Sequence, residues 1–396
     1  MKRQWNRILA LLMVLACLLG GSGCSSMPAW VRDLLPEDVR NQIPLESGEL
    51  LPDDGVPRYG RTLLDEEGQY VYDQLVRGIR RTEPSQAIDL SGAKSLTQEE
   101  LNRAVELFSA DHPECFWFAK SYSYASKGDR IVRIFPDYYL TGDELTAARA
   151  ELDAAVDAIV EAAPKDATAI ELALYYHDAV AHAVTYEKVG YHQTAYGALV
   201  ENKAVCAGYA AAYQLLMHRA GFQALTVIGT SVDRVAEASS AGGAEESVLH
   251  AWNVIWLANG YCFYTDVTWD DSAADAHTFH YYFNLSLDEM AADHHVDESI
   301  FTLPACSHTG YDYFDTLALG SLSDTSSIDT IVQTFRLVEP GVYEANFRFE
   351  SDRNAFEWFK ARDSKILAGL APHAKSCSYS VRSMAGEVLI RLEITE

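Results

Sequence analysis

Cys206 begins a stretch whose pattern predicts a helix, CAGYAAAYQLLMHRAG, in which Gly221 suits the left-handed position that ends a helix. A thiol becomes an effective nucleophile once it ionises, and the unpaired amides and the dipole of a helix N-terminus favour the thiolate. A neighbouring imidazole and partial access to water act in the same direction. We therefore interpret Cys206 as a candidate nucleophile. The alternative is an inert buried thiol that serves as a small apolar residue.

A histidine and an aspartate further along the chain supply the other members of a nucleophile, base and orienter set. His250 opens a predicted strand, HAWNVIWL, and Asp266 lies near the end of the next one, YCFYTDVTW. A carboxylate bonded to an imidazole fixes the tautomer of the ring and supports the imidazolium that forms when the histidine accepts a proton.

The turn between these two strands decides whether His250 and Asp266 share a face. A two-residue turn at Asn259 and Gly260 would leave them on opposite faces, because side chains alternate along a strand. A three-residue loop ending with Gly260 in the left-handed region would instead place Asp266 opposite Trp252, with His250 as a diagonal neighbour. The hypothesis therefore predicts an odd-length loop or a bulge at this turn.

Three segments, TAYGALVENKAVCAGYAAAYQLLMHRAGF, HAWNVIW and YCFYTDVTWDD, together resemble the motifs of the transglutaminase-like superfamily. The order Cys, His, Asp matches at Cys206, His250 and Asp266, and the resemblance covers about residues 165–285. It implies an α+β core similar to papain-type cysteine peptidases, in which the helix bearing the cysteine packs on an antiparallel sheet bearing the histidine and the aspartate. It also implies that the cysteine forms a thioester with an acyl donor. Because the family contains cross-linking enzymes, peptidases, amidases and members without catalysis, the reaction stays open.

Acyl transfer also needs hydrogen-bond donors for the developing oxyanion. The backbone amide of Cys206 is the natural first donor, and Gln193 and Tyr196 are the side-chain candidates for the second. Trp252, beside His250, is a candidate for the wall of the cleft. This chemistry requires no cofactor, and the sequence contains no recognisable calcium loop.

Other cysteines and histidines favour ordinary structural interpretations. Besides Cys24 and a cysteine in the N-terminal segment, five cysteines remain, so at least one thiol stays free or pairs between molecules. We expect core thiols or one disulfide among Cys115, Cys262, Cys306 and Cys377. The stretch DHHVDE, residues 293–298, could bind a metal ion, but nothing else is spaced to complete a site, so a solvated polar loop is the preferred interpretation.

The N-terminal segment predicts export. Three basic residues precede an apolar run over residues 8–19, which is too short to span a bilayer as a helix. The sequence LLGGSGCSS resembles the lipobox of bacterial lipoproteins and predicts lipidation of Cys24, although Gly21 departs from the usual apolar residue and leaves plain secretion as the alternative. Without residues 1–23 the formal charge changes from −26 to about −29. Such an excess of negative charge repels nucleic acid and anionic lipid head groups. It therefore excludes a nucleic-acid role, and we expect any attachment to the membrane to be through the lipid.

The sequence also predicts how the chain is divided into segments. We expect a signal peptide over residues 1–23, a tether over 24–60, a helical and hairpin region over 61–164, the transglutaminase-like domain over 165–320, and a small α+β module over 331–396. A mobile loop is expected over 236–247 and a linker over 321–330. Capping-box spacings predict helices over about 98–110, 142–162 and 168–184, headed by Thr97, Thr141 and Thr168. A hairpin is expected around Gly128, and strand, helix, strand, strand in the final module.

These features together predict an exported, lipid-anchored thiol acyl-transfer enzyme that acts on peptide or protein amides, with a cell-wall peptide as one candidate substrate. Water is favoured over an amine as the acyl acceptor, because an enzyme outside the cell meets water at a far higher concentration than any amine. The alternative is a non-catalytic protein that binds a peptide or a cell-wall strand on the same fold.

Overall fold

A computed structural model describes residues 48–232, 247–257, 260–272, 277–316, 321–322, 341–349, 361–362, 364–365, 376–384 and 387–395. These residues form two compact units. The first contains the described residues up to Ala163 together with residues 187–227 and 297–303, and the second contains residues 164–186, 228–296 and the described residues from Pro304 onward. The predicted signal peptide, Cys24, the predicted tether up to residue 47, most of the predicted mobile loop and most of the predicted linker lie outside the described residues.

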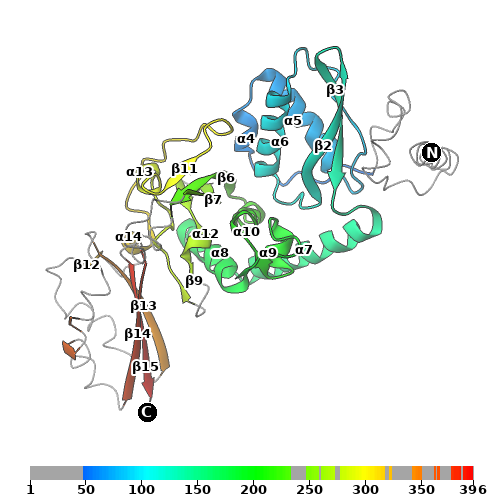
Figure 1. Cartoon of the computed structure of the whole chain (residues 1–396). Helices are drawn as coiled ribbons and strands as arrows, with labels where there is room; N and C mark the ends of the chain where they lie inside the picture. The colour runs from blue at the N-terminus through cyan, green and yellow to red at the C-terminus, as the bar shows by residue number, and fades with distance from the viewer. Residues whose placement is uncertain are drawn as a thin grey trace, which may run out of the picture. The chain divides into compact units, whose positions relative to one another are not determined.

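The first unit combines helices with a small sheet (Figure 1). Its sheet has the strand order β1-β3-β2, and the predicted hairpin is formed by β2 and β3, with Gly128 at a φ of 65° in its turn. The elements of this unit are α4 (Tyr59–Thr62), α5 (Glu66–Ile79), β1 (Ile88–Asp89), α6 (Gln98–Asp111), β2 (Phe118–Lys127), β3 (Arg130–Tyr138), α7 (Gly142–Ala162), α9 (Ala195–Leu199), β5 (Lys203–Ala204) and α10 (Cys206–Arg219). Helix α5 contacts β1, α6 contacts β2, and α10 packs beside α7 and α9.

Two of the three predicted capping boxes form. The Thr97 and Thr168 side chains accept from the backbone of Glu100 and Glu171, whose carboxylates accept from the two threonine amides in return. Thr141 makes no side-chain cap, so that box was wrong, although α7 still begins at Gly142 as the spacing predicts. The sequence therefore located all three helix starts, including that of α8 (Ala169–Ala183) in the second unit.

The second unit contains a four-stranded sheet of order β11-β6-β7-β8. Strand β7 pairs antiparallel with β8, and β11 pairs antiparallel with β6. The strands of this sheet are β6 (Gln223–Val232, which begins in the first unit), β7 (Ser247–Trp256), β8 (Cys262–Thr265) and β11 (His294–Val296). Besides α8 and the C-terminal strands described below, the unit has the short elements β4 (Thr185–Tyr186), α12 (Val267–Asp270), β9 (Asp271–Ser272), β10 (His277–Thr278), α13 (Leu287–Met290) and α14 (Tyr313–Thr316).

The register of β7 and β8 is the one that a three-residue loop requires. Asn253 lies opposite Thr265, and Trp256 lies opposite Cys262. The amide of Leu257 donates to the carbonyl of Tyr261 at 2.9 Å, and Gly260 has a φ of 79°. This confirms the predicted register. The expectation that the second strand continues through Trp269 was wrong, because β8 ends at Thr265 and Asp266 caps a turn of helix, α12.

The described part of the C-terminal module is a sheet of order β12-β13-β15-β14. Its strands are β12 (Ser321–Leu322), β13 (Gly341–Phe349), β14 (Ser376–Met384) and β15 (Glu387–Thr395), and the last three confirm the predicted strands. β12 pairs parallel with β13, so the start of the predicted linker is a strand instead. The predicted helix falls mostly on residues outside those described.

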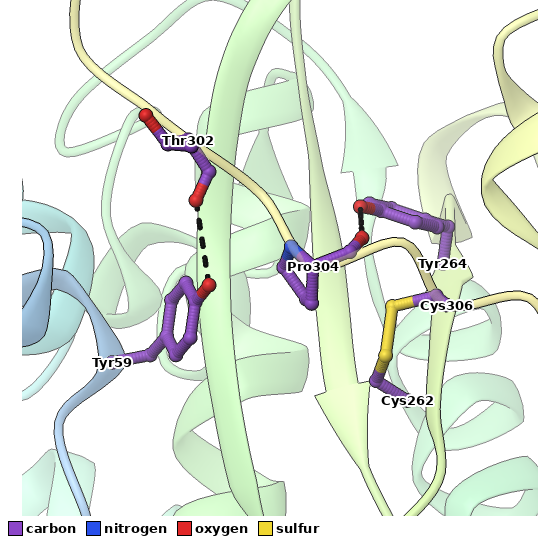
Figure 2. Close-up of a disulfide and its surroundings, with 6 residues drawn as sticks. All are labelled: Tyr59, Cys262, Tyr264, Thr302, Pro304 and Cys306. Atoms are coloured by element: carbon purple, nitrogen blue, oxygen red, sulfur yellow. Dashed lines mark hydrogen bonds between the residues drawn. A yellow bond between two sulfur atoms is a disulfide. The ribbon is translucent and has the colours of Figure 1, made fainter.

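A disulfide joins β8 to the segment that begins after residue 303. Cys262 and Cys306 are bonded across a sequence separation of 44, and nearby the Tyr264 hydroxyl donates to the carbonyl of Pro304 at 3.1 Å (Figure 2). In the first unit, the Tyr59 hydroxyl donates to the carbonyl of Thr302 at 3.3 Å. The sequence analysis left core thiols or one disulfide as alternatives for these cysteines; the structure pairs Cys262 with Cys306, and Cys115 is a free, buried thiol.

The described chain therefore has an α+β fold with the helix and strand elements of a papain-like core, as the sequence predicts. Among its described helices, none combines the length and the apolar character needed to cross a bilayer.

Candidate active site

In the first unit, Cys206 is the first residue of α10. Its thiol is free and half-buried. Val205 precedes it at the N-cap and has no side-chain oxygen to accept from the first-turn amides. Such an uncapped helix N-terminus is an environment that favours negative charge. The local structure therefore gives Cys206 the first of the features that activate a thiol.

Helix α10 is held firmly within its unit. The Gln214 side-chain amide is fully buried and donates to the carbonyls of Ala110 at 2.8 Å and Ala224 at 3.1 Å. Near the start of the helix, a Cβ on Gly208 would lie 2.5 Å from the carbonyl oxygen of His192, so only glycine fits there. The predicted glycine at the other end, Gly221, has a φ of 85°. These contacts fix the direction in which the helix presents Cys206.

In the second unit, His250 on β7 and Asp266 after β8 form a buried pair. His250 Nε2 lies 2.5 Å from Asp266 Oδ2. Only 5% of the histidine side chain and 1% of the aspartate side chain are exposed. An ionised carboxylate can only accept, so the Nε2 nitrogen carries the proton. Nδ1 is then the nitrogen whose lone pair can accept a proton from an acid such as a thiol.

The two oxygens of Asp266 have separate partners. Oδ1 accepts from the backbone amides of Thr268 at 2.9 Å and Trp269 at 3.2 Å, which makes Asp266 the N-cap of α12. Oδ2 faces His250 and a second histidine, His294, whose Nε2 is 3.0 Å away. Burial alone would raise the pKa of Asp266, but the charges and hydrogen bonds of the two histidines outweigh it and hold that pKa well below its ordinary value.

His294 is the residue that the sequence interpretation placed wrongly. It lies on β11, which pairs with β6, and its side chain is fully buried instead of being part of a solvated loop. Its Nδ1 is 2.6 Å from Asp293 Oδ1, so both ring nitrogens face carboxylates. Burial lowers the pKa of His294, but the hydrogen bonds with Asp266 and Asp293 reverse this and raise it. The arrangement suits an imidazolium that holds Asp266 in place.

Aromatic rings surround this group. The Trp252 ring stacks on His250 with centroids 6.1 Å apart and meets the His294 ring edge-on at 4.9 Å. Trp269 packs against both histidines. The Trp252 indole nitrogen is buried without a hydrogen-bond partner. The structure thus brings three predicted residues together, His250, Asp266 and Trp252.

The two side-chain candidates for an oxyanion donor lie in the first unit. Gln193 is exposed in the turn before α9. Tyr196 lies on α9, where its ring stacks on Phe116 at 4.9 Å and its hydroxyl donates to Glu151 at 2.6 Å. The hydrogen bond to Glu151 raises the pKa of Tyr196 to about 12, so its hydroxyl remains protonated at neutral pH.

Comparison with known proteins supports the resemblance. Residues 154–266 match the family model described as the transglutaminase-like superfamily. The matched region includes α10 and the strand pair and ends at Asp266. No curated protein matches the chain. The family predicted from the three sequence motifs is therefore confirmed for this region.

Proposed function

With a transglutaminase-like domain over residues 154–266 as the premise, we propose that the chain is a thiol-dependent acyl-transfer enzyme acting on peptide or protein amides. In this proposal Cys206 attacks the amide carbonyl, His250 takes the thiol proton through Nδ1 and returns it to the leaving amine, and Asp266 orients His250. The observation that carries the proposal is the buried His250–Asp266 pair, which fixes the tautomer that a proton acceptor needs.

The acyl acceptor is proposed to be water. An amine acceptor would make the protein a cross-linking enzyme, whereas water makes it a peptidase or amidase. Water is favoured because an exported enzyme meets it at far higher concentration than any amine. A fluorescent primary amine added at low concentration separates the two, since a cross-linking enzyme would attach it to the acyl donor in preference to hydrolysis, whereas a peptidase or amidase would mainly release the free acid.

The location is proposed to be outside the cytoplasm. The Cys262–Cys306 disulfide supports this, because structural disulfides form and persist in oxidising compartments. We propose that the chain is anchored by a lipid on Cys24, with simple secretion as the alternative. Mass spectrometry of the N-terminal peptide of the exported protein would identify the lipid.

The first experiment measures the alkylation of Cys206 by iodoacetamide as a function of pH, located by peptide mass, in the wild type and in His250→Gln. We expect rapid modification at and below neutral pH in the wild type, because His250 accepts the thiol proton. The profile should move to higher pH in the variant. Cys115 is the internal control, because burial raises the pKa of its thiol well above the ordinary value and should leave it unmodified in the folded protein.

Two results would count against catalysis. Wild type and His250→Gln could have the same alkylation profile, or Cys206 could stay unmodified until the protein unfolds. Either would favour a protein that binds a peptide or cell-wall strand on the same fold. Once a substrate is found, Cys206→Ala should lower the rate by several orders of magnitude if the proposal holds.

A further inference from the structure

A second group of histidines and carboxylates lies in the second unit, and the proposed reaction does not use it. It is assembled from α8, which carries His177 and Asp178, from the end of α12, which carries Asp270, and from the segment after β10, which carries His280. His177 Nδ1 lies 2.9 Å from Asp178 Oδ1, and His280 Nε2 lies 2.8 Å from the same oxygen. The side chains of His177, Asp178 and His280 offer donor atoms that all lie within 4.8 Å of one another.

The far side of His177 is held by a buried carboxylate. His177 Nε2 is 3.1 Å from Asp270 Oδ2, and neither side chain is exposed. Asp270 is itself fixed, because its Oδ1 accepts from the amide of Tyr282 at 3.0 Å and its carbonyl accepts from the amide of Phe279 at 2.7 Å. A carboxylate behind a histidine in this way is typical of metal-binding histidines, since it sets the tautomer and the orientation of the ring.

The tautomer has a consequence for the opposite nitrogen. When Nε2 carries the proton donated to Asp270, the Nδ1 lone pair of His177 points at the carboxylate oxygen of Asp178. A lone pair and a carboxylate oxygen repel each other at 2.9 Å unless a proton or a metal cation lies between them. With His177 in this tautomer, the cluster therefore needs a proton or a metal cation between His177 Nδ1 and Asp178 Oδ1.

Solvent can reach this point from one side. The Asp178 side chain is 31% exposed, whereas those of His177 and His280 are 0% and 9% exposed. The His280 ring is supported by Tyr313, which stacks on it at 4.1 Å. The His250, Asp266 and His294 group differs in this respect, because all three of its residues are buried. An ion therefore has an entry path to the His177, Asp178 and His280 group that the His250, Asp266 and His294 group lacks.

We propose that His177 through Nδ1, Asp178 through Oδ1 and His280 through Nε2 bind one zinc ion, with Asp270 supporting His177 from behind. Two imidazoles and one carboxylate form a ligand set that zinc accepts, and three protein ligands leave a fourth position for water on the open side. Ligand atoms around a tetrahedral zinc with bonds of about 2.0–2.1 Å lie roughly 3.3–3.4 Å apart. The observed separations of 2.8 and 2.9 Å would have to widen only slightly.

A protonated network is the competing explanation. In that case the positive charge is a proton on His177, and no ion binds. Burial lowers the pKa of His177, but the hydrogen bonds with Asp178 and Asp270 more than compensate and raise it to about 9. Because this network would be stable without metal, only a direct binding measurement separates the two explanations.

The test is calorimetric titration of the purified chain with Zn²⁺, in a Cys206→Ser background and with a purification tag that contains no histidine. The background removes the half-buried thiol as an alternative ligand and makes the result independent of the proposed catalysis. We expect one zinc ion per chain. His280→Gln should weaken binding at least a hundredfold, and Asp270→Asn should weaken it by about 10–100-fold.

Two controls make the assignment specific. His182→Gln changes an exposed histidine on the same helix, and His294→Gln changes the other buried group; both should retain wild-type affinity. Co²⁺ binding gives a second readout, because an N₂O site with one water has an intense visible spectrum that His280→Gln should abolish even if thermal stability falls. Absence of zinc binding in the wild type, unchanged binding in His280→Gln, or loss of binding in His294→Gln would each overturn the proposal.

Discussion

Asp266 Oδ2 connects the residues of the candidate site, because it lies within hydrogen-bonding distance of both His250 Nε2 and His294 Nε2. His250 faces this carboxylate through Nε2, whereas His294 faces carboxylates through both of its ring nitrogens. Two chemically identical side chains are thereby given different roles. In the proposed reaction His250 takes and returns a proton, whereas the hydrogen bonds of His294 with Asp266 and Asp293 outweigh its burial and favour its charged form.

The role of His294 predicts a pH-dependent loss of stability in His294→Gln. Burial lowers the folded-state pKa of His294, but the hydrogen bonds with Asp266 and Asp293 outweigh it, so that the pKa is raised. The charge of His250 acts to lower this pKa, and the Tyr282 hydroxyl donates a hydrogen bond to Asp293. The stabilisation from its positive charge is therefore fully present below the pKa of an unfolded histidine, about 6.5, and is lost as the pH rises through the higher folded value. Asp266 does not alter this trend, because its depressed pKa keeps it ionised throughout that range.

Urea unfolding at several pH values measures the effect. We expect His294→Gln to cost about 1–3 kcal/mol at pH 5.5 and progressively less as the pH increases. His295→Gln, which changes the exposed neighbour on the same strand, is the control and should have little effect at any pH. A cost for His294→Gln that does not depend on pH would mean that this histidine is neutral in the folded protein.

At the level of the elements, the sequence defined the β7–β8 hairpin better than it defined the helical turn after Asp266. Gly260 and the requirement that His250 and Asp266 share a face were enough to predict the register that is observed. Helix α12 was missed because Val267, Thr268 and Trp269 favour strands. The signal for it was Asp266 itself, since aspartate is a favoured N-cap and its side chain accepts from the amides of Thr268 and Trp269.

The positions of His294 and His177 could not be obtained from local pattern. His294 is buried because β11 pairs with β6, more than 60 residues earlier, and His177 meets Asp270 across 93 residues. Such contacts depend on tertiary packing, which propensity and periodicity do not describe. The DHHVDE stretch showed the right residue types, but its polarity suggested solvent.

Strand β11 also yields a prediction, because it passes very close to Gly229. A Cβ on Gly229 would lie 2.1 Å from the carbonyl oxygen of His295 and 2.8 Å from the Trp252 ring. Gly229→Ala should therefore displace β11 or Trp252, reduce stability by about 1–3 kcal/mol, and lower the rate of Cys206 alkylation at neutral pH by disturbing His250. Thr230→Ala, one residue further along β6, is the matched control. If Gly229→Ala kept wild-type stability and alkylation, β11 would not be needed to position His250.

At the level of the whole molecule, each compact unit is assembled from separate stretches of the chain. The chain passes from one unit to the other more than once, so neither unit is a continuous stretch of sequence. One of these passages lies between Leu303 and Pro304, shortly before Cys306 and its disulfide.

Reduction of the Cys262–Cys306 disulfide should destabilise the second unit. Closing a loop of this length contributes about 4 kcal/mol in the chain-entropy model, and disulfides typically contribute about 2–4 kcal/mol. We expect a lower Tm in the presence of a phosphine reductant and a similarly lowered Tm in the double variant Cys262→Ala, Cys306→Ala, measured by differential scanning calorimetry. The double variant should be insensitive to the reductant. A wild-type Tm that does not change on reduction would show that this bond contributes little to stability.

The short helix α12 gives the two histidine groups a fixed spacing along the chain. Asp266 at its start belongs to one group and Asp270 at its end belongs to the other, so they are separated by about one helical turn. Inserting or deleting one residue between them would rotate one carboxylate by about 100° relative to the other, and one of the two groups would lose its aspartate. The pattern Asp-x-x-x-Asp after a β-strand can therefore be used to search genomes. Sequences that retain both aspartates are predicted to have the carboxylates of both groups, and sequences that retain only the first are predicted to have the proposed catalytic pair with a weakened zinc site.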